Sequence, residues 1–137
     1  MQCVEYKKSY KGLVWWLVLM FALTVAAAFL PIRDGDLMTR IFLNVMGFLL
    51  VALMFIIYKA EAVYWINGVT FEEAKEAGSE RRKRFALRHL ERFGWFALLY
   101  LLFSVGAQLT GIGMGYDVAL WAIGLIVTAV CTIPIKL

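Results

Sequence analysis

Residues 12–32 read GLVWWLVLMFALTVAAAFLPI, and none of these 21 side chains is charged. A helix rises about 1.5 Å per residue, so about 20 apolar residues cross a hydrocarbon layer about 30 Å thick. Three more uncharged runs follow, at residues 41–58, 93–116 and 118–135. The four runs hold 81 of the 137 residues. We therefore expect an all-α integral membrane protein with most of its chain in lipid.

Composition supports this expectation. Hydrophobic residues make up 63% of the chain and charged residues 18%, against about 45–50% and about 25% in soluble domains. A single core in a soluble protein of this length could not bury so much apolar surface. The net charge is +4, and the cations lie beside apolar runs, which favours anionic lipid headgroups over nucleic acid as the partner.

The boundaries of the runs predict one domain, an antiparallel bundle of four transmembrane helices. The expected spans are about residues 12–32, 37–58, 93–111 and 117–135. Pro31 and Gly35 break the first hairpin, and three glycines (Gly111, Gly113 and Gly115) break the second. Residues 59–92 should form an amphipathic helical loop between the second and third helices.

The distribution of Lys and Arg predicts the orientation. Twelve of the 14 lie in the N-terminal tail, in residues 59–92 or at the C-terminus, whereas Arg33 and Arg40 lie on the other side. Cytoplasmic loops of membrane proteins carry an excess of Lys and Arg. We therefore expect a plasma-membrane protein with both termini in the cytoplasm.

The loop carries a helix-start signal and a cluster of cations. Thr70 and Glu73 match a capping box, and Gly78 should end the short helix that follows. Helical periodicity then places Ala86, Leu87 and other apolar residues opposite an arginine stripe. The cations expected to contact lipid or a protein partner are Arg81, Arg82, Lys83, Arg84, Arg88 and Arg92. A simpler reading is that they only enforce topology.

The uncharged runs offer few groups for chemistry. They contain no ionisable acid or base apart from thiol and phenol groups, which argues against proton-coupled antiport and voltage sensing. By depth along the helices, Asn44, Ser104 and Gln108 should meet in the outer half of the bilayer. They would either bond the helices together or line a small cavity.

No cofactor or metal is expected, because Cys3 and Cys131 are far apart and His89, the single histidine, has no ligand-spaced companion. His89 should face solvent or headgroups. Small residues at close-packing positions should let helices touch, within one chain or between copies; they are Ala22, Ala26, Gly47, Gly124, Thr128 and Thr132.

These patterns favour a non-catalytic membrane protein that acts as an oligomer or as an accessory subunit of a larger membrane complex. Its basic cytoplasmic helix would make the contact. The alternative is an oligomeric transporter or channel for a small neutral or anionic solute. A lipid-active enzyme would need Asp34, Asp36, His89 or Asp117 to converge at one interface.

Overall fold

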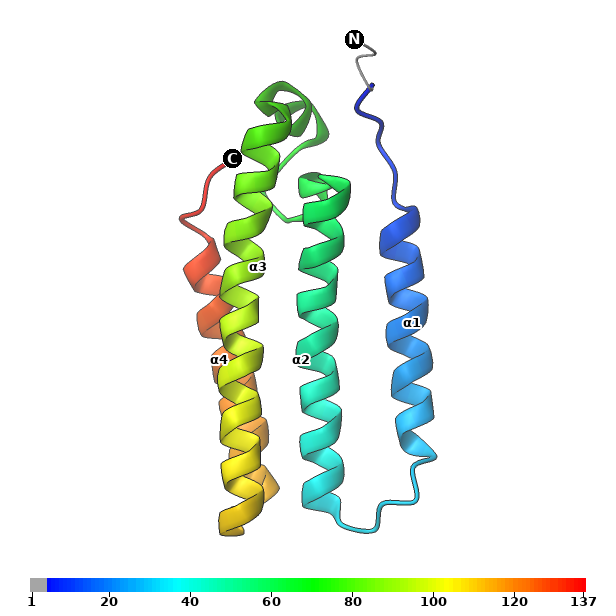
Figure 1. The fold of residues 1–137 in the computed structure, drawn as a ribbon, viewed down its shortest axis with the longest axis vertical. Coiled ribbons are helices and arrows are strands. Elements are labelled where there is room, and N and C mark those ends of the chain that lie inside the picture. The colour runs from blue at the N-terminus through cyan, green and yellow to red at the C-terminus, as the bar shows by residue number, and fades with distance from the viewer. Residues whose placement is uncertain (1–4) are drawn as a thin grey trace.

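The computed structural model describes residues 5–137 and contains no strand within them. These residues form four long helices, which Figure 1 labels, and one short 3-10 helix. Their bounds are α1 Lys11–Ala28, α2 Gly35–Ala60, η1 Val63–Trp65, α3 Phe71–Thr110 and α4 Met114–Thr132. All four α-helices are long and apolar enough to cross a membrane. The expected all-α class is therefore confirmed.

The helices run antiparallel, and α2 lies in the middle of the bundle. It packs against α3 and α4, while α1 packs against α2 at one edge (Figure 1). Two tryptophans fasten the outer helices to the α2 backbone. Trp16 Nε1 donates to the Leu49 carbonyl at 2.7 Å, and Trp121 Nε1 donates to the Leu43 carbonyl at 3.0 Å.

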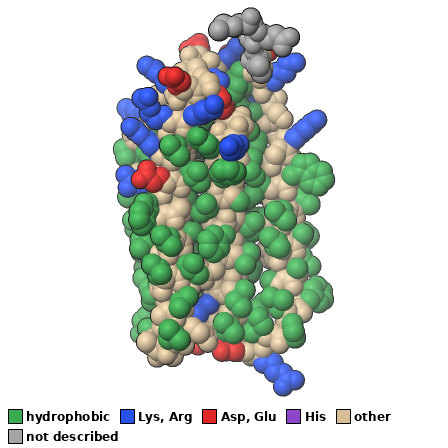
Figure 2. Space-filling view, in the orientation of Figure 1, with side chains coloured by type: hydrophobic (Ala, Val, Ile, Leu, Met, Phe, Trp, Pro, Cys, Tyr) green, Lys and Arg blue, Asp and Glu red, His purple; other side chains and the backbone are tan. Residues whose placement is uncertain are grey.

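The two ends of the bundle differ in charge. Residue 5, the α2–α3 connection and the C-terminus lie at one end, where Figure 2 shows Lys and Arg side chains gathered. We call this the basic end, and the end with the α1–α2 and α3–α4 turns the opposite end. Between them the visible surface is mostly hydrophobic, as lipid-facing helices require.

Helix α3 is divided near its start. The predicted capping box is present: Thr70 Oγ1 accepts from the Glu73 amide at 3.2 Å, and Glu73 Oε2 accepts from the Thr70 amide at 2.8 Å. Gly78 then adopts φ 77° and ψ 162°, which kinks the helix. Such a positive φ suits glycine because it has no Cβ. A short first segment thus leads into the long membrane-spanning one.

The buried side of α3 differs from the predicted apolar arc. His89 is 3% exposed, although we expected it to face solvent or headgroups, whereas Leu87, which we placed opposite the arginine stripe, is 49% exposed. His89 Nδ1 lies 3.0 Å from the Phe85 carbonyl oxygen. The expectation for His89 is wrong because an apolar side chain beside lipid gains little by turning inward, so the buried side of the helix need not be its apolar side.

Candidate functional site

A buried ion pair lies near the opposite end. Arg40 extends from the second turn of α2 toward Asp117, in the first turn of α4. Its Nε lies 3.2 and 3.1 Å from the two carboxylate oxygens, and its Nη2 lies 3.0 Å from Oδ2. The side chains are 5% and 0% exposed. Each charge therefore depends on the other for its compensation.

Neighbouring groups accept further hydrogen bonds from Arg40. Nη1 donates to Gln108 Oε1 and Nη2 donates to the Ile112 carbonyl. The Tyr100 hydroxyl donates to Asp117 Oδ1 at 3.4 Å. These five residues form the opposite-end network, which joins α2, α3, the α3–α4 turn and α4. Each of the three guanidinium nitrogens therefore has at least one hydrogen-bond acceptor within the network.

Sequence reasoning missed this network because it treated Arg40 and Asp117 as boundary residues. A signal was present: Arg40 immediately precedes the second uncharged run, Asp117 alone separates the third from the fourth, and the two carry opposite charges on the same predicted side of the bundle. Ionisable groups at such depth normally pair with one another.

The predicted polar cluster is only partly assembled. Asn44 Nδ2 donates to Ser104 Oγ at 2.9 Å and to the Arg40 carbonyl at 2.8 Å. Gln108 bonds to Arg40 instead of joining the other two. A groove of about 390 Å³ between α2 and α3 passes all three residues. Asn44 Oδ1 is buried there and has no hydrogen-bond partner among the described residues.

A second network holds the basic end together. Glu61 caps α2 with φ 54°, in the left-handed region that non-glycine residues rarely adopt. Its carboxylate accepts from Ser79 Oγ at 2.7 Å and from Arg82 Nε and Nη2, both at 2.8 Å. Lys83 Nζ lies 3.5 Å away. Arg82 Nη1 also donates to the Ala74 carbonyl at 2.9 Å.

These contacts set the charge state of Glu61. Burial by itself would raise the pKa of the carboxyl group. The hydrogen bonds from Ser79 and Arg82, with the positive charges of Arg82 and Lys83, outweigh burial and hold the pKa below its ordinary value of 4.5. Glu61 is therefore ionised at neutral pH.

Aromatic residues bind the N-terminal segment to this network. The Tyr64 hydroxyl accepts from the Ser9 amide and donates to the Ser9 carbonyl, both at 2.7 Å. Tyr6 stacks on Phe71 with ring centroids 5.3 Å apart, and its ring lies 3.9 Å from the Arg82 guanidinium carbon. Burial is the main cause that raises the pKa of Tyr6 to about 12.

The six predicted contact cations fall into two groups. Arg82 is buried, and Lys83, half-exposed, is paired with Glu61. The other four are exposed at three- or four-residue spacing on α3, and none forms a salt bridge with any of residues 5–137. We call these four the basic face: Arg81, Arg84, Arg88 and Arg92. Residues three and four apart share one side of a helix.

The small residues also divide. Gly47 lies beside Trp121 and Ala97, and Gly124 lies against the ring of Phe96, so both serve packing within the chain. Thr128 and Thr132 bond to carbonyls of their own helix. Ala22 and Ala26 differ from these, because both are exposed.

The acidic and histidine side chains do not converge on one site. Asp34 caps the start of α2, and Asp117 is paired with Arg40. His89 is buried on α3, nearer the basic end. Among residues 5–137 no three His, Cys, Asp or Glu side chains are grouped so that they could hold a metal ion. Cys3 lies outside the described residues.

No protein-family model, curated protein or solved structure matches this chain. Function is therefore inferred from the residues themselves.

Proposed function

We propose that this is a non-catalytic membrane protein that acts as an oligomer or as an accessory subunit of a larger membrane complex. The basic face makes the contact. The observation that carries the proposal is that its four cations are exposed and have no acidic partner among the described residues. An anionic surface could therefore bind them without first displacing an internal carboxylate.

The surface available to such a partner depends on orientation. Twelve of the 14 Lys and Arg residues belong to the segments of the basic end, so we assign that end to the cytoplasmic side of the plasma membrane. Anionic headgroups are enriched there, and each cation near them contributes about 1 kcal/mol. A cysteine in place of Arg84 should then react with an impermeant thiol reagent only after cells are lysed.

The internal polar groups are less suited to a transport function. Arg40 and Asp117 neutralise each other, and Asn44 is bonded to Ser104. The unpaired Asn44 Oδ1 beside the α2–α3 groove is the observation that favours the alternative, a transporter or channel for a small neutral or anionic solute. Asn44→Val should abolish flux into liposomes under that alternative and leave association unchanged under our proposal.

Charge reversal tests the proposed contact. The variant Arg81→Glu, Arg84→Glu, Arg88→Glu should lose its oligomer or its co-purifying partner in mild detergent, as measured by native mass spectrometry and pull-down. It keeps Arg82, so the Glu61 network stays intact. The matched control reverses Arg33, Lys75 and Lys136, which lie off the basic face. Equal association of the two variants would refute the proposal.

A further inference from the structure

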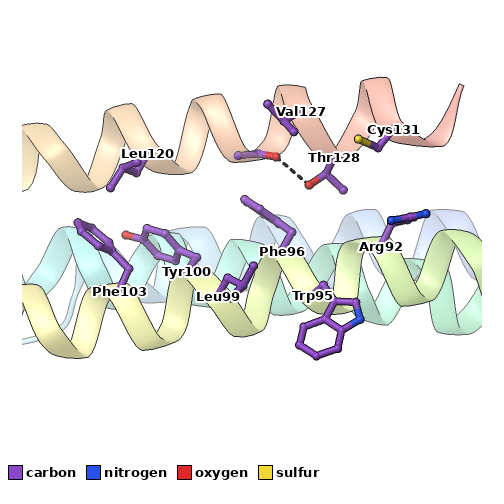
Figure 3. Close-up of a pocket in the computed structure, with 11 residues that line it drawn as sticks. Arg92, Trp95, Phe96, Leu99, Tyr100, Phe103, Leu120, Val127, Thr128 and Cys131 are labelled. Carbon is purple, nitrogen blue, oxygen red and sulfur yellow. Dashed lines mark hydrogen bonds between the residues drawn. The ribbon is translucent and has the colours of Figure 1, made fainter.

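A second groove, of about 440 Å³, runs between α3 and α4 in Figure 3. Its ends are defined by two pairs of facing residues: Arg92 and Cys131 at one end, Phe103 and Leu120 at the other. Eleven residues separate the ends on each helix, which is about 16 Å of helix. This length is close to one leaflet of a hydrocarbon layer about 30 Å thick.

The walls of this α3–α4 groove are almost entirely apolar. Phe96, Leu99 and Val127 line it together with Gly124 and Thr128. A Cβ at Gly124 would lie 2.9 Å from Phe96 Cε2, so the missing side chain lets this ring lie against α4. The Thr128 hydroxyl donates to the Gly124 carbonyl at 2.7 Å. The groove therefore presents hydrocarbon and no unpaired hydroxyl donor.

A cation stands at the end nearer the basic end of the bundle. Arg92 is exposed and forms no salt bridge with any residue in the described part of the chain. Arg88 lies one turn farther toward the basic end on the same helix. An arginine can bind phosphate oxygens through two parallel N–H donors. The groove therefore has apolar walls and a cation at one end. This arrangement is complementary to a phospholipid, which has an apolar chain and a phosphate at its head.

We propose that the α3–α4 groove binds one acyl chain of an anionic phospholipid, with the lipid phosphate held by Arg92. The unpaired guanidinium favours a lipid over a helix from a second copy, because a phospholipid brings both an apolar chain for the walls and a phosphate for Arg92. The groove binds lipid through Arg92 whether or not Arg81, Arg84 and Arg88 bind a protein partner.

Native mass spectrometry of the detergent-solubilised protein tests the site. Dioleoyl phosphatidylglycerol should bind more tightly than dioleoyl phosphatidylcholine and saturate first at one molecule per chain. Leu99→Trp should fill the groove and weaken binding about tenfold or more. Leu102→Trp is the matched control, because both leucines are on α3 and are 60% and 62% exposed, but only Leu99 lines the groove.

The headgroup contact has its own matched pair. Arg92→Gln should weaken phosphatidylglycerol binding about fivefold, which corresponds to the loss of one cation near an anionic headgroup. It should weaken phosphatidylcholine binding less, because the choline group already offsets the charge of that lipid's phosphate. Arg81→Gln removes an exposed cation of the same helix remote from the groove and should leave the affinity of this first site unchanged. Equal effects of Arg92→Gln and Arg81→Gln would overturn the headgroup assignment.

Cys131 provides a readout that needs no change in the groove. It is exposed and lies beside Arg92. In a Cys3→Ser background, phosphatidylglycerol should slow its reaction with N-ethylmaleimide about fivefold relative to phosphatidylcholine. Equal rates, or equal lipid binding by Leu99→Trp and Leu102→Trp, would overturn the proposal. A dimer that Leu99→Trp dissociates without loss of lipid would assign the groove to a second copy instead.

Discussion

Asp117→Asn should destabilise the protein strongly, because it leaves the Arg40 guanidinium buried without a counter-charge. The two side chains are almost fully enclosed, and three nitrogen–oxygen distances of 3.0–3.2 Å join them. Removing one member of a buried ion pair costs about 3–5 kcal/mol. The bonds from Arg40 to Gln108 and Ile112 remain in this variant, so we expect the lower half of that range.

The expected loss converts to a measurable melting shift. A change of 1 kcal/mol moves the Tm of a chain of roughly this size by about 2–4 °C. A loss of about 3–4 kcal/mol therefore lowers Tm by about 6–16 °C. Circular dichroism of the protein in nanodiscs at neutral pH measures this shift.

Two further variants separate the pair from its surroundings. Arg40→Met combined with Asp117→Leu should recover most of the lost stability, because replacing a buried pair with apolar groups is often neutral or stabilising. Arg33→Gln, which removes an exposed cation at the same end, should leave Tm unchanged. A fall of less than about 2 °C for Asp117→Asn would refute the reasoning, because it would mean that water or lipid phosphate compensates Arg40.

Two other perturbations give clear expectations. The pKa of Glu61 is lowered in the folded protein, so its pairing with Arg82 stabilises the fold above about pH 4.5 and this contribution is lost as the pH falls through the lowered pKa. In melting curves between neutral pH and about pH 4, the Tm of Glu61→Gln should therefore fall less with acid than the Tm of the unchanged protein. Parallel pH profiles of the two Tm values would contradict this. Gly124→Ala should lower the free energy of unfolding by about 1–3 kcal/mol in denaturant titrations, because its Cβ would meet Phe96 at 2.9 Å. Gly106→Ala is the control: its Cβ meets nothing within 4 Å, so it should be neutral or slightly stabilising. Equal losses for the two variants would show that the close approach of Phe96 is not what matters.

The helices were predictable because membrane-crossing segments must be long, apolar and free of charge, and this pattern is visible in the sequence. Charge-free runs located all four, since a charged side chain in hydrocarbon is costly and rare. The capping box at Thr70 and the break at Gly78 were also predictable, because both are local features of the chain. Nothing beyond the neighbouring residues decides such features.

The contacts between helices could not be predicted in the same way. Arg40 and Asp117 are 77 positions apart, and their pairing depends on which sides of α2 and α4 face each other. In a soluble helix the apolar side would reveal this, but here lipid accepts apolar side chains on every side. The same uncertainty misplaced His89.

Neighbouring arginines show how far tertiary contacts divide a charge run. Arg81 and Arg82 are adjacent and chemically identical, yet they lie about 100° apart around α3. Arg82 is held by Glu61 and the Ala74 carbonyl, whereas Arg81 is exposed. Glu61 ends α2, so the Glu61–Arg82 pair fixes α3 against α2 at the point where the basic face begins. An exposed cation held on a fixed helix loses less conformational entropy on binding than one on a flexible loop. The buried arginine therefore positions the exposed ones, as the proposed contact requires.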